Sequence, residues 1–150
     1  MTVDAGAGDD TITLTSVGAL ATINANEGDD TIEMDEDATT YVVIGGAGDD
    51  TYDFGTETSM DATIVDASGS DDTLVIGANH DSSGAELALS GIDVFEMGSY
   101  NLTLNDNQFG NNNAVKIEGS GTLTVNARSG KAATIDASDV TMTSSHTVSI

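Results

Sequence analysis

The sequence contains no cysteine, proline or tryptophan, and only three Lys or Arg among its 150 residues. Without cysteine, no disulfide can hold the fold. The scarcity of basic residues excludes nucleic acid and anionic membranes as partners, because both demand a basic surface. No stretch approaches the roughly eighteen consecutive apolar residues that a membrane-spanning helix needs. Membrane insertion is therefore not expected.

Negative charge is concentrated in the first half of the chain. Residues 1–76 contain 18 Asp or Glu and no Lys or Arg, whereas residues 77–150 contain eight acids and all three bases. The net charge of −23 opposes a compact state through self-repulsion. With 17 Gly and many Val, Ile and Thr, the composition favours one all-β domain or a part of a longer array.

One acidic turn recurs four times at intervals of 20, 20 and 22 residues. The copies are Gly8-Asp9-Asp10-Thr11-Ile12, Gly28-Asp29-Asp30-Thr31-Ile32, Gly48-Asp49-Asp50-Thr51-Tyr52 and Ser70-Asp71-Asp72-Thr73-Leu74. A fixed period near twenty is typical of a solenoid, in which one repeat stacks on the next. Stacking would bring the carboxylates of every copy to one edge, where they need a cation to stay close together.

The segment Gly45–Asp53 matches the pattern G-G-x-G-x-D-x-U-x at every position. It resembles the calcium-binding nonapeptide of the RTX family. In the copy Ala25–Glu33, Asn26 stands at a glycine position, and Asn is the residue that best tolerates a left-handed backbone after glycine. The remaining copies are Ala5–Thr13 and, with two serines at glycine positions, Ala67–Val75.

The resemblance implies a set of calcium ligands. Calcium takes six to eight hard oxygen ligands, and glycines let the turn bend so that its carbonyls point inward. The implied side-chain ligands, at the sixth position, are Asp10, Asp30, Asp50 and Asp72. The implied carbonyl ligands are those of Gly6, Gly8, Gly46 and Gly48. The fifth position also carries aspartates: Asp9, Asp29, Asp49 and Asp71. They are interpreted either as outer acids of the site or as solvated side chains, and solvation is favoured.

The fold predicted from these repeats is an all-β parallel β-solenoid, a β-roll or β-helix of about seven coils. Residues 1–76 form the RTX-like calcium-binding coils, and residues 77–150 continue the solenoid without calcium motifs. The family usually carries the nonapeptide on both turns of a coil. Here the alternate turns do not match it, so calcium is expected on one edge only. Thr11 and its equivalents should point outward, and Ile12 and its equivalents into the core.

Alternating apolar residues predict six further short strands in the second half. They are expected near Ile92–Glu96, Leu102–Leu104, Val115–Ile117, Leu123–Val125, Val140–Met142 and Val148–Ile150. The segment Asp81–Ser90 is compatible with a helical turn, and Asp106–Asn113 is expected to be a polar loop. The segment Leu89–Met97, followed by Asn101–Leu104, resembles segments beside RTX repeats in large secreted bacterial adhesins and S-layer proteins.

The sequence predicts a protein that is not an enzyme. His80 and His146 have no serine or acid at the spacing of a catalytic triad, so both are interpreted as solvated loop residues. Arg128 and Lys131, the bases that a calcium-dependent lyase would use, lie in the half without calcium motifs.

Two functions remain open. The first is a calcium-binding structural protein of the bacterial surface, such as an S-layer, matrix filament or adhesin segment, that folds and assembles on calcium. The second is a non-catalytic calcium-binding module of a type I-secreted enzyme such as an alginate epimerase. The resemblance implies type I secretion to the cell surface, and the first residues predict a strand rather than a signal peptide. Expected partners are further copies, in a homo-oligomer or head-to-tail polymer, or neighbouring solenoid domains of a longer chain.

Overall fold

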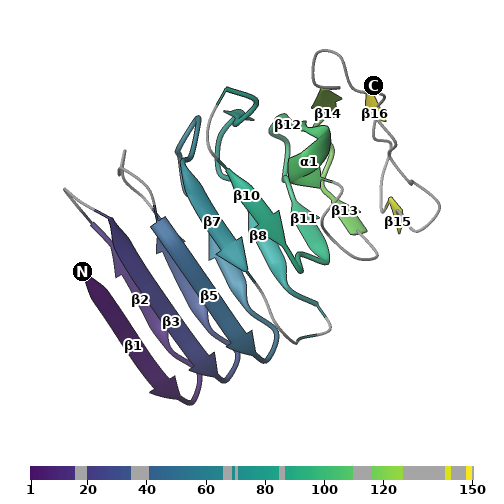
Figure 1. The fold of residues 1–150 in the computed structure, drawn as a ribbon. Coiled ribbons are helices and arrows are strands. Elements are labelled where there is room, and N and C mark those ends of the chain that lie inside the picture. The colour runs from purple at the N-terminus through teal and green to yellow at the C-terminus, as the bar shows by residue number, and fades with distance from the viewer. Residues whose placement is uncertain are drawn as a thin grey trace.

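The chain winds into a parallel β-solenoid, in which strands of successive coils lie side by side (Figure 1). The structure, a computed structural model, describes residues 1–15, 20–34, 41–65, 69, 71–84, 87–109, 116–126, 141–142 and 148–149. Within these ranges every strand pairing is parallel. The predicted all-β solenoid is therefore confirmed.

Three sheets make up the sides of the solenoid. In spatial order, the first contains β1 (Thr2–Ala7), β3 (Ala21–Glu27), β5 (Tyr41–Ala47), β7 (Ala62–Val65) and β10 (Ala88–Ser90). The second contains β2 (Thr11–Leu14), β4 (Thr31–Met34), β6 (Thr51–Asp53), β8 (Thr73–Val75), β11 (Val94–Glu96), β13 (Lys116–Glu118) and β15 (Thr141–Met142). The third contains β9 (His80–Asp81), β12 (Leu102–Asn105), β14 (Leu123–Asn126) and β16 (Val148–Ser149).

The sequence period equals one coil. Thr11 pairs with Thr31, Thr31 with Thr51 and Thr51 with Thr73, so the four acidic turns lie in register. The second sheet then continues from β8 to β11 without a break. The solenoid makes about five turns, slightly fewer than the seven predicted. The second sheet has seven strands, but the first has only five among the described residues.

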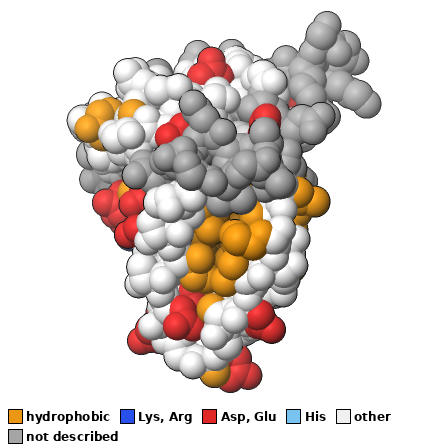
Figure 2. Space-filling model, turned by 90° about the vertical axis from the view of Figure 1, so that its left-hand side faces the viewer, with side chains coloured by type: hydrophobic (Ala, Val, Ile, Leu, Met, Phe, Trp, Pro, Cys, Tyr) orange, Lys and Arg blue, Asp and Glu red, His pale blue; other side chains and the backbone are white. Residues whose placement is uncertain are grey.

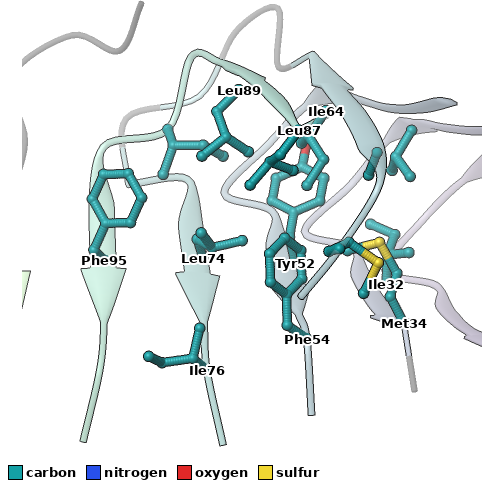
Figure 3. Packing of buried hydrophobic residues seen from close by; sticks show 14 of the residues in the cluster. Ile32, Met34, Tyr52, Phe54, Ile64, Leu74, Ile76, Leu87, Leu89 and Phe95 are labelled. Carbon is teal, nitrogen blue, oxygen red and sulfur yellow. The ribbon is translucent and has the colours of Figure 1, made fainter. Parts of the chain in front are cut away.

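The core lies between the sheets and follows the alternation of each strand. Ile32, Tyr52 and Leu74 on the second sheet are at most 1% exposed, and Phe95 continues their row (Figure 3). Ile64 points at this row from the first sheet, as do other buried residues of that side. Burial of each such side chain stabilises the fold by roughly 1.5–3 kcal/mol. The inward and outward positions predicted around the acidic turns are confirmed.

All six strands predicted in the second half are present, within two residues of their expected bounds. A helix occurs in the second half, but in the expected polar loop rather than in the described part of the segment compatible with a helical turn. The described part of Asp81–Ser90 contains the end of β9 and all of β10, whereas the expected polar loop begins with α1 (Asp106–Phe109). This helix is too short to show a hydrophobic period. No helix in the described ranges is long and apolar enough to cross a membrane.

A side-chain cap at the start of the short helix explains why it forms at this point. Gln108 is the third residue of α1, and its Oε1 accepts a hydrogen bond from the backbone N–H of Asn105 at 2.7 Å. This is the side-chain half of a capping box, which satisfies a donor that the helix itself leaves unpaired. The spacing Asn105-x-x-Gln108 was the available sequence signal.

Candidate functional site

The acidic turns join the first sheet to the second, and their backbone requires glycine or asparagine. Asn26 is the only non-glycine residue with a positive φ, 86°, in the described part of the chain. It lies in register between Gly6 and Gly46 of the adjacent coils, which also have positive φ. A Cβ at Gly46 would collide with the carbonyl oxygen of Asn26. The prediction that Asn26 replaces a glycine is confirmed, and the close approach of the coils explains the glycine that faces it.

The sixth-position aspartates form a column that we call the inner ladder: Asp10, Asp30, Asp50 and Asp72. Each N–H donates to the carboxylate of the next coil. The distances are 2.7 Å from Asp10 N to Asp30 Oδ1, 2.8 Å from Asp30 N to Asp50 Oδ1, and 2.9 Å from Asp50 N to Asp72 Oδ1. The last three side chains are 1%, 0% and 2% exposed, and Asp10 is half-buried.

The fifth-position aspartates form a second column, the outer ladder: Asp9, Asp29, Asp49 and Asp71. All four are exposed. Its hydrogen bonds run in the opposite direction, because Asp29 N donates to Asp9 Oδ1 at 3.0 Å and Asp49 N to Asp29 Oδ1 at 2.9 Å. Exposure agrees with the interpretation of these residues as solvated, but Asp9 and Asp29 additionally bind the following coil.

One oxygen of the inner ladder is buried without a hydrogen-bond partner among the described residues. This oxygen is Asp30 Oδ2. A buried carboxylate oxygen without a partner costs on the order of 1–3 kcal/mol or more, and a charged group lies at the upper end. Among the described Lys and Arg, Lys116 pairs with Glu118 rather than with the ladder. The charge of the inner ladder therefore has no protein cation to balance it in the described structure.

Oxygen atoms also converge between the coils. Gly69 lies close to these oxygens, since a Cβ added there would collide with the carbonyl oxygen of Gly48 and with both carboxylate oxygens of Asp72. The Gly8 carbonyl meets Gly28 in the same manner. Carboxylates and turn carbonyls are the ligands that calcium prefers. Thus the donor set at the predicted residues fits calcium.

The described residues contain no cluster of three or more His, Cys, Asp or Glu arranged to hold a metal ion. A cation in the inner ladder would therefore have to take backbone carbonyls, or water, beside one or two carboxylates. Calcium accepts such mixed oxygen shells, whereas zinc requires nitrogen or sulfur ligands in most of its sites.

Asp93 is a further member of the inner ladder that was not predicted from the sequence. Val94 pairs with Thr73, so Asp93 takes the position that Asp72 holds in the preceding coil. Its Oδ2 accepts from Asp72 N at 3.4 Å, and its own N–H donates to Asp72 O at 2.9 Å. The signal was the spacing of 21 residues from Asp72, together with Gly91 two residues earlier. Valines, which carry no carboxylate, precede Lys116 and Thr141 in the sequence.

The interpretation of His80 as a solvated loop residue was wrong. His80 belongs to β9 and is 2% exposed. Burial lowers its pKa from the ordinary value of 6.5, against the raising effects of the Glu57 carbonyl and of Asp81. The other residues considered for catalysis, His146, Arg128 and Lys131, lie outside the described residues.

Comparisons with known protein families, with curated proteins and with solved structures find no match to this chain.

Proposed function

We propose that the stacked acidic turns bind calcium and that the chain is a structural segment of an extracellular bacterial surface protein, of the S-layer, matrix-filament or adhesin type. In this proposal calcium lies between adjacent coils of the inner ladder and couples folding to the external calcium concentration. Extracellular calcium sites commonly work in the millimolar range. Secretion in a calcium-poor, unfolded form by a type I pathway is consistent with this coupling.

The observation that carries the proposal is the unpartnered, buried Asp30 Oδ2. It belongs to a column of carboxylates separated by about one strand spacing, roughly 4.8 Å. Negative charges at this spacing repel one another strongly away from water. A bound cation removes both costs, since it satisfies the oxygen and neutralises the column. Magnesium fits less well, because it demands near-octahedral geometry at about 2.0–2.1 Å and dehydrates reluctantly.

The face of the first coil supports an assembling protein. Hydrophobic side chains gather in the middle of this face, with acidic side chains around them (Figure 2). Val3 and Ile12 are only partly buried there, and Met1 and Leu20 are 62% and 56% exposed. We propose that another solenoid coil stacks on this face, in a homo-oligomer, a head-to-tail polymer or a neighbouring solenoid domain. Calcium-promoted association that Ile12→Glu abolishes in sedimentation would support the homo-oligomer or polymer. A monomer at every protein and calcium concentration would exclude both and leave the neighbouring solenoid domain.

Calcium titration of matched variants tests the site. Asp30→Asn keeps the Oδ1 acceptor for Asp10 N but replaces the orphan oxygen by an amide. We expect calorimetry to show weaker calcium binding, about tenfold or more, while the calcium-free protein becomes more stable. The control Asp29→Asn keeps its acceptor on the exposed ladder and should leave calcium affinity within about twofold. Equal effects of the two substitutions, or no calcium binding by the unmodified chain at several times about 1 mM, would overturn the proposal.

A further inference from the structure

The third sheet begins part-way along the solenoid, and its first strand is covered by a loop. β9 is the edge strand of this sheet and pairs with β12 on one side only. On the other side, the segment Phe54–Met60 lies against it, and Asp81 N donates to Thr58 O at 2.8 Å. Open sheet edges recruit other strands, so a cover of this kind protects the edge.

Side chains of β9 and the residue beside it hold the covering loop. His80 Nδ1 lies 2.9 Å from Glu57 O, and His80 Nε2 lies 2.7 Å from Ser82 Oγ. Ser82 Oγ in turn accepts from Met60 N at 3.3 Å. The His80 ring also packs on Phe54, with ring centroids 5.0 Å apart. We call His80, Ser82 and the Glu57 carbonyl the His80 clasp.

The hydrogen bonds define the protonation state of the clasp. A carbonyl oxygen only accepts, so Nδ1 carries the hydrogen in the bond to Glu57. In the neutral ring Nε2 is then an acceptor for the hydroxyl of Ser82. Protonation would make Nε2 a donor and force that hydroxyl to turn toward Met60 O, which is 3.5 Å away. The closed clasp therefore matches the neutral imidazole.

We propose that the His80 clasp is an acid-sensitive latch: it holds the loop Phe54–Met60 on β9 when His80 is neutral and releases it when His80 is protonated. Release would uncover the edge of the third sheet. The proposal does not rest on calcium, since none of the inner-ladder residues takes part in the clasp. It goes beyond the structural role proposed above.

The balance of charges sets the direction of the effect. Burial of His80 lowers its pKa, and this outweighs the Glu57 carbonyl and the Asp81 carboxylate, which both raise it. Asp81 on the same strand is the charged group that acts on the ring, and Glu57 on the loop contacts the ring through its backbone carbonyl. On the other side, β12 opposes His80 and Asp81 with the uncharged Leu102 and Thr103. Once released, His80 regains an ordinary pKa near 6.5. Protons therefore bind more tightly to the open state, and opening increases as the pH falls below about 6.5.

Hydrogen exchange of the Asp81 amide measures the latch, because this N–H donates to the loop. With calcium held constant, we expect its protection to fall, by up to about tenfold, between about pH 7.5 and pH 5.5, after correction for the intrinsic exchange rate. The Thr122 amide, which donates to Asn101 Oδ1 in the same sheet away from the loop, is the reference and should change little. NMR titration of His80 should give a midpoint below the ordinary value.

Two variants decide the outcome. His80→Gln cannot titrate, so its Asp81 protection should not depend on pH in this range. Asp81→Asn retains an acceptor for the two bonds from Ser83, but removes the charge that raises the His80 pKa. It should therefore lower the His80 midpoint measured by NMR and make the loss of protection at low pH at least as large. If His80→Gln fails to hold the loop at any pH, Asp81→Asn remains decisive, because residue-81 protection that no longer falls with pH in this variant would overturn the latch. The same pH dependence in His80→Gln and the unmodified chain would also overturn it.

Discussion

The N-terminal and C-terminal coils share one backbone architecture but are held together by different side chains. Between the N-terminal coils, carboxylates accept backbone N–H groups on two ladders. Between the C-terminal coils, the uncharged side-chain amide oxygens of asparagines accept backbone N–H groups instead. Asn79 Oδ1 accepts from Asn101 N at 2.9 Å, and Asn101 Oδ1 accepts from Thr122 N at 2.9 Å. The same kind of bond is thus made with and without charge.

The C-terminal half also contains a buried polar network that is satisfied within the chain. Gln108 is 1% exposed, and its Nε2 donates to Ser82 O at 3.0 Å and to Leu87 O at 3.1 Å. Asn105 Nδ2 donates to Ser83 O at 2.8 Å. Such a network needs no ion. The comparison indicates that charge is not required to stack coils, so a column of buried carboxylates points to an added role, for which calcium is the proposed explanation.

Removal of calcium should produce the largest effect, because it should lower the stability of the N-terminal half far more than that of the C-terminal half. With a chelator, we expect amide protection in β3 and β5 to fall by orders of magnitude, because the inner ladder loses its counter-charge. β12 and β14 should lose much less. Hydrogen exchange with mass spectrometry can compare the two regions in one sample. Equal loss in both halves would show that the solenoid folds as a single calcium-dependent unit.

Gln108→Ala should produce the next largest effect. It leaves the carbonyls of Ser82 and Leu87 and the N–H of Asn105 without their partner, at a cost of about 2–4 kcal/mol. Since no charge is involved, the loss should be the same with and without calcium. Urea unfolding monitored by circular dichroism measures it. A loss that calcium relieves would contradict the calcium-independence of this half.

Asp50→Asn should have an effect whose sign depends on calcium. Asp50 is wholly buried and lies between the Asp30 and Asp72 coils, so the substitution alters two interfaces of the inner ladder. In calcium we expect destabilisation by about 1–3 kcal/mol, and without calcium a neutral or stabilising effect, because repulsion is relieved. Thermal melts in both conditions make the measurement. The same sign in both would argue against a cation in the ladder.

Asn101→Asp should have the smallest effect, within about 0.5 kcal/mol. The carboxylate keeps the acceptor for Thr122 N on an exposed residue, and it has no second carboxylate beside it in the Asn79 column. Calcium affinity by calorimetry should therefore not increase. A new site in this variant would mean that one carboxylate suffices and that stacking is not the basis of binding.

The sequence was sufficient for the features that repeat and insufficient for those that occur once. The spacing of Asp10, Asp30 and Asp50 predicted the coil, its register and the column of carboxylates, because the same contact is made at each interface. His80 and α1 could not be found in this way. His80 is buried under the single loop Phe54–Met60, and α1 depends on the contacts of the Gln108 side chain. Neither arrangement repeats along the chain, so the periodicity could not predict it.

The opposed directions of the two ladders bear on how such a chain can change its length. At the first two interfaces each coil gives one carboxylate to its neighbour and receives one from it, so both interfaces present the same pair of bonds. Duplication or deletion of a whole coil in the gene would join faces that already match. A frame-preserving insertion of a few residues inside a turn would instead shift donors away from acceptors on both ladders. We therefore expect the number of coils to change in whole coils, and the length of the acidic turn to stay the same.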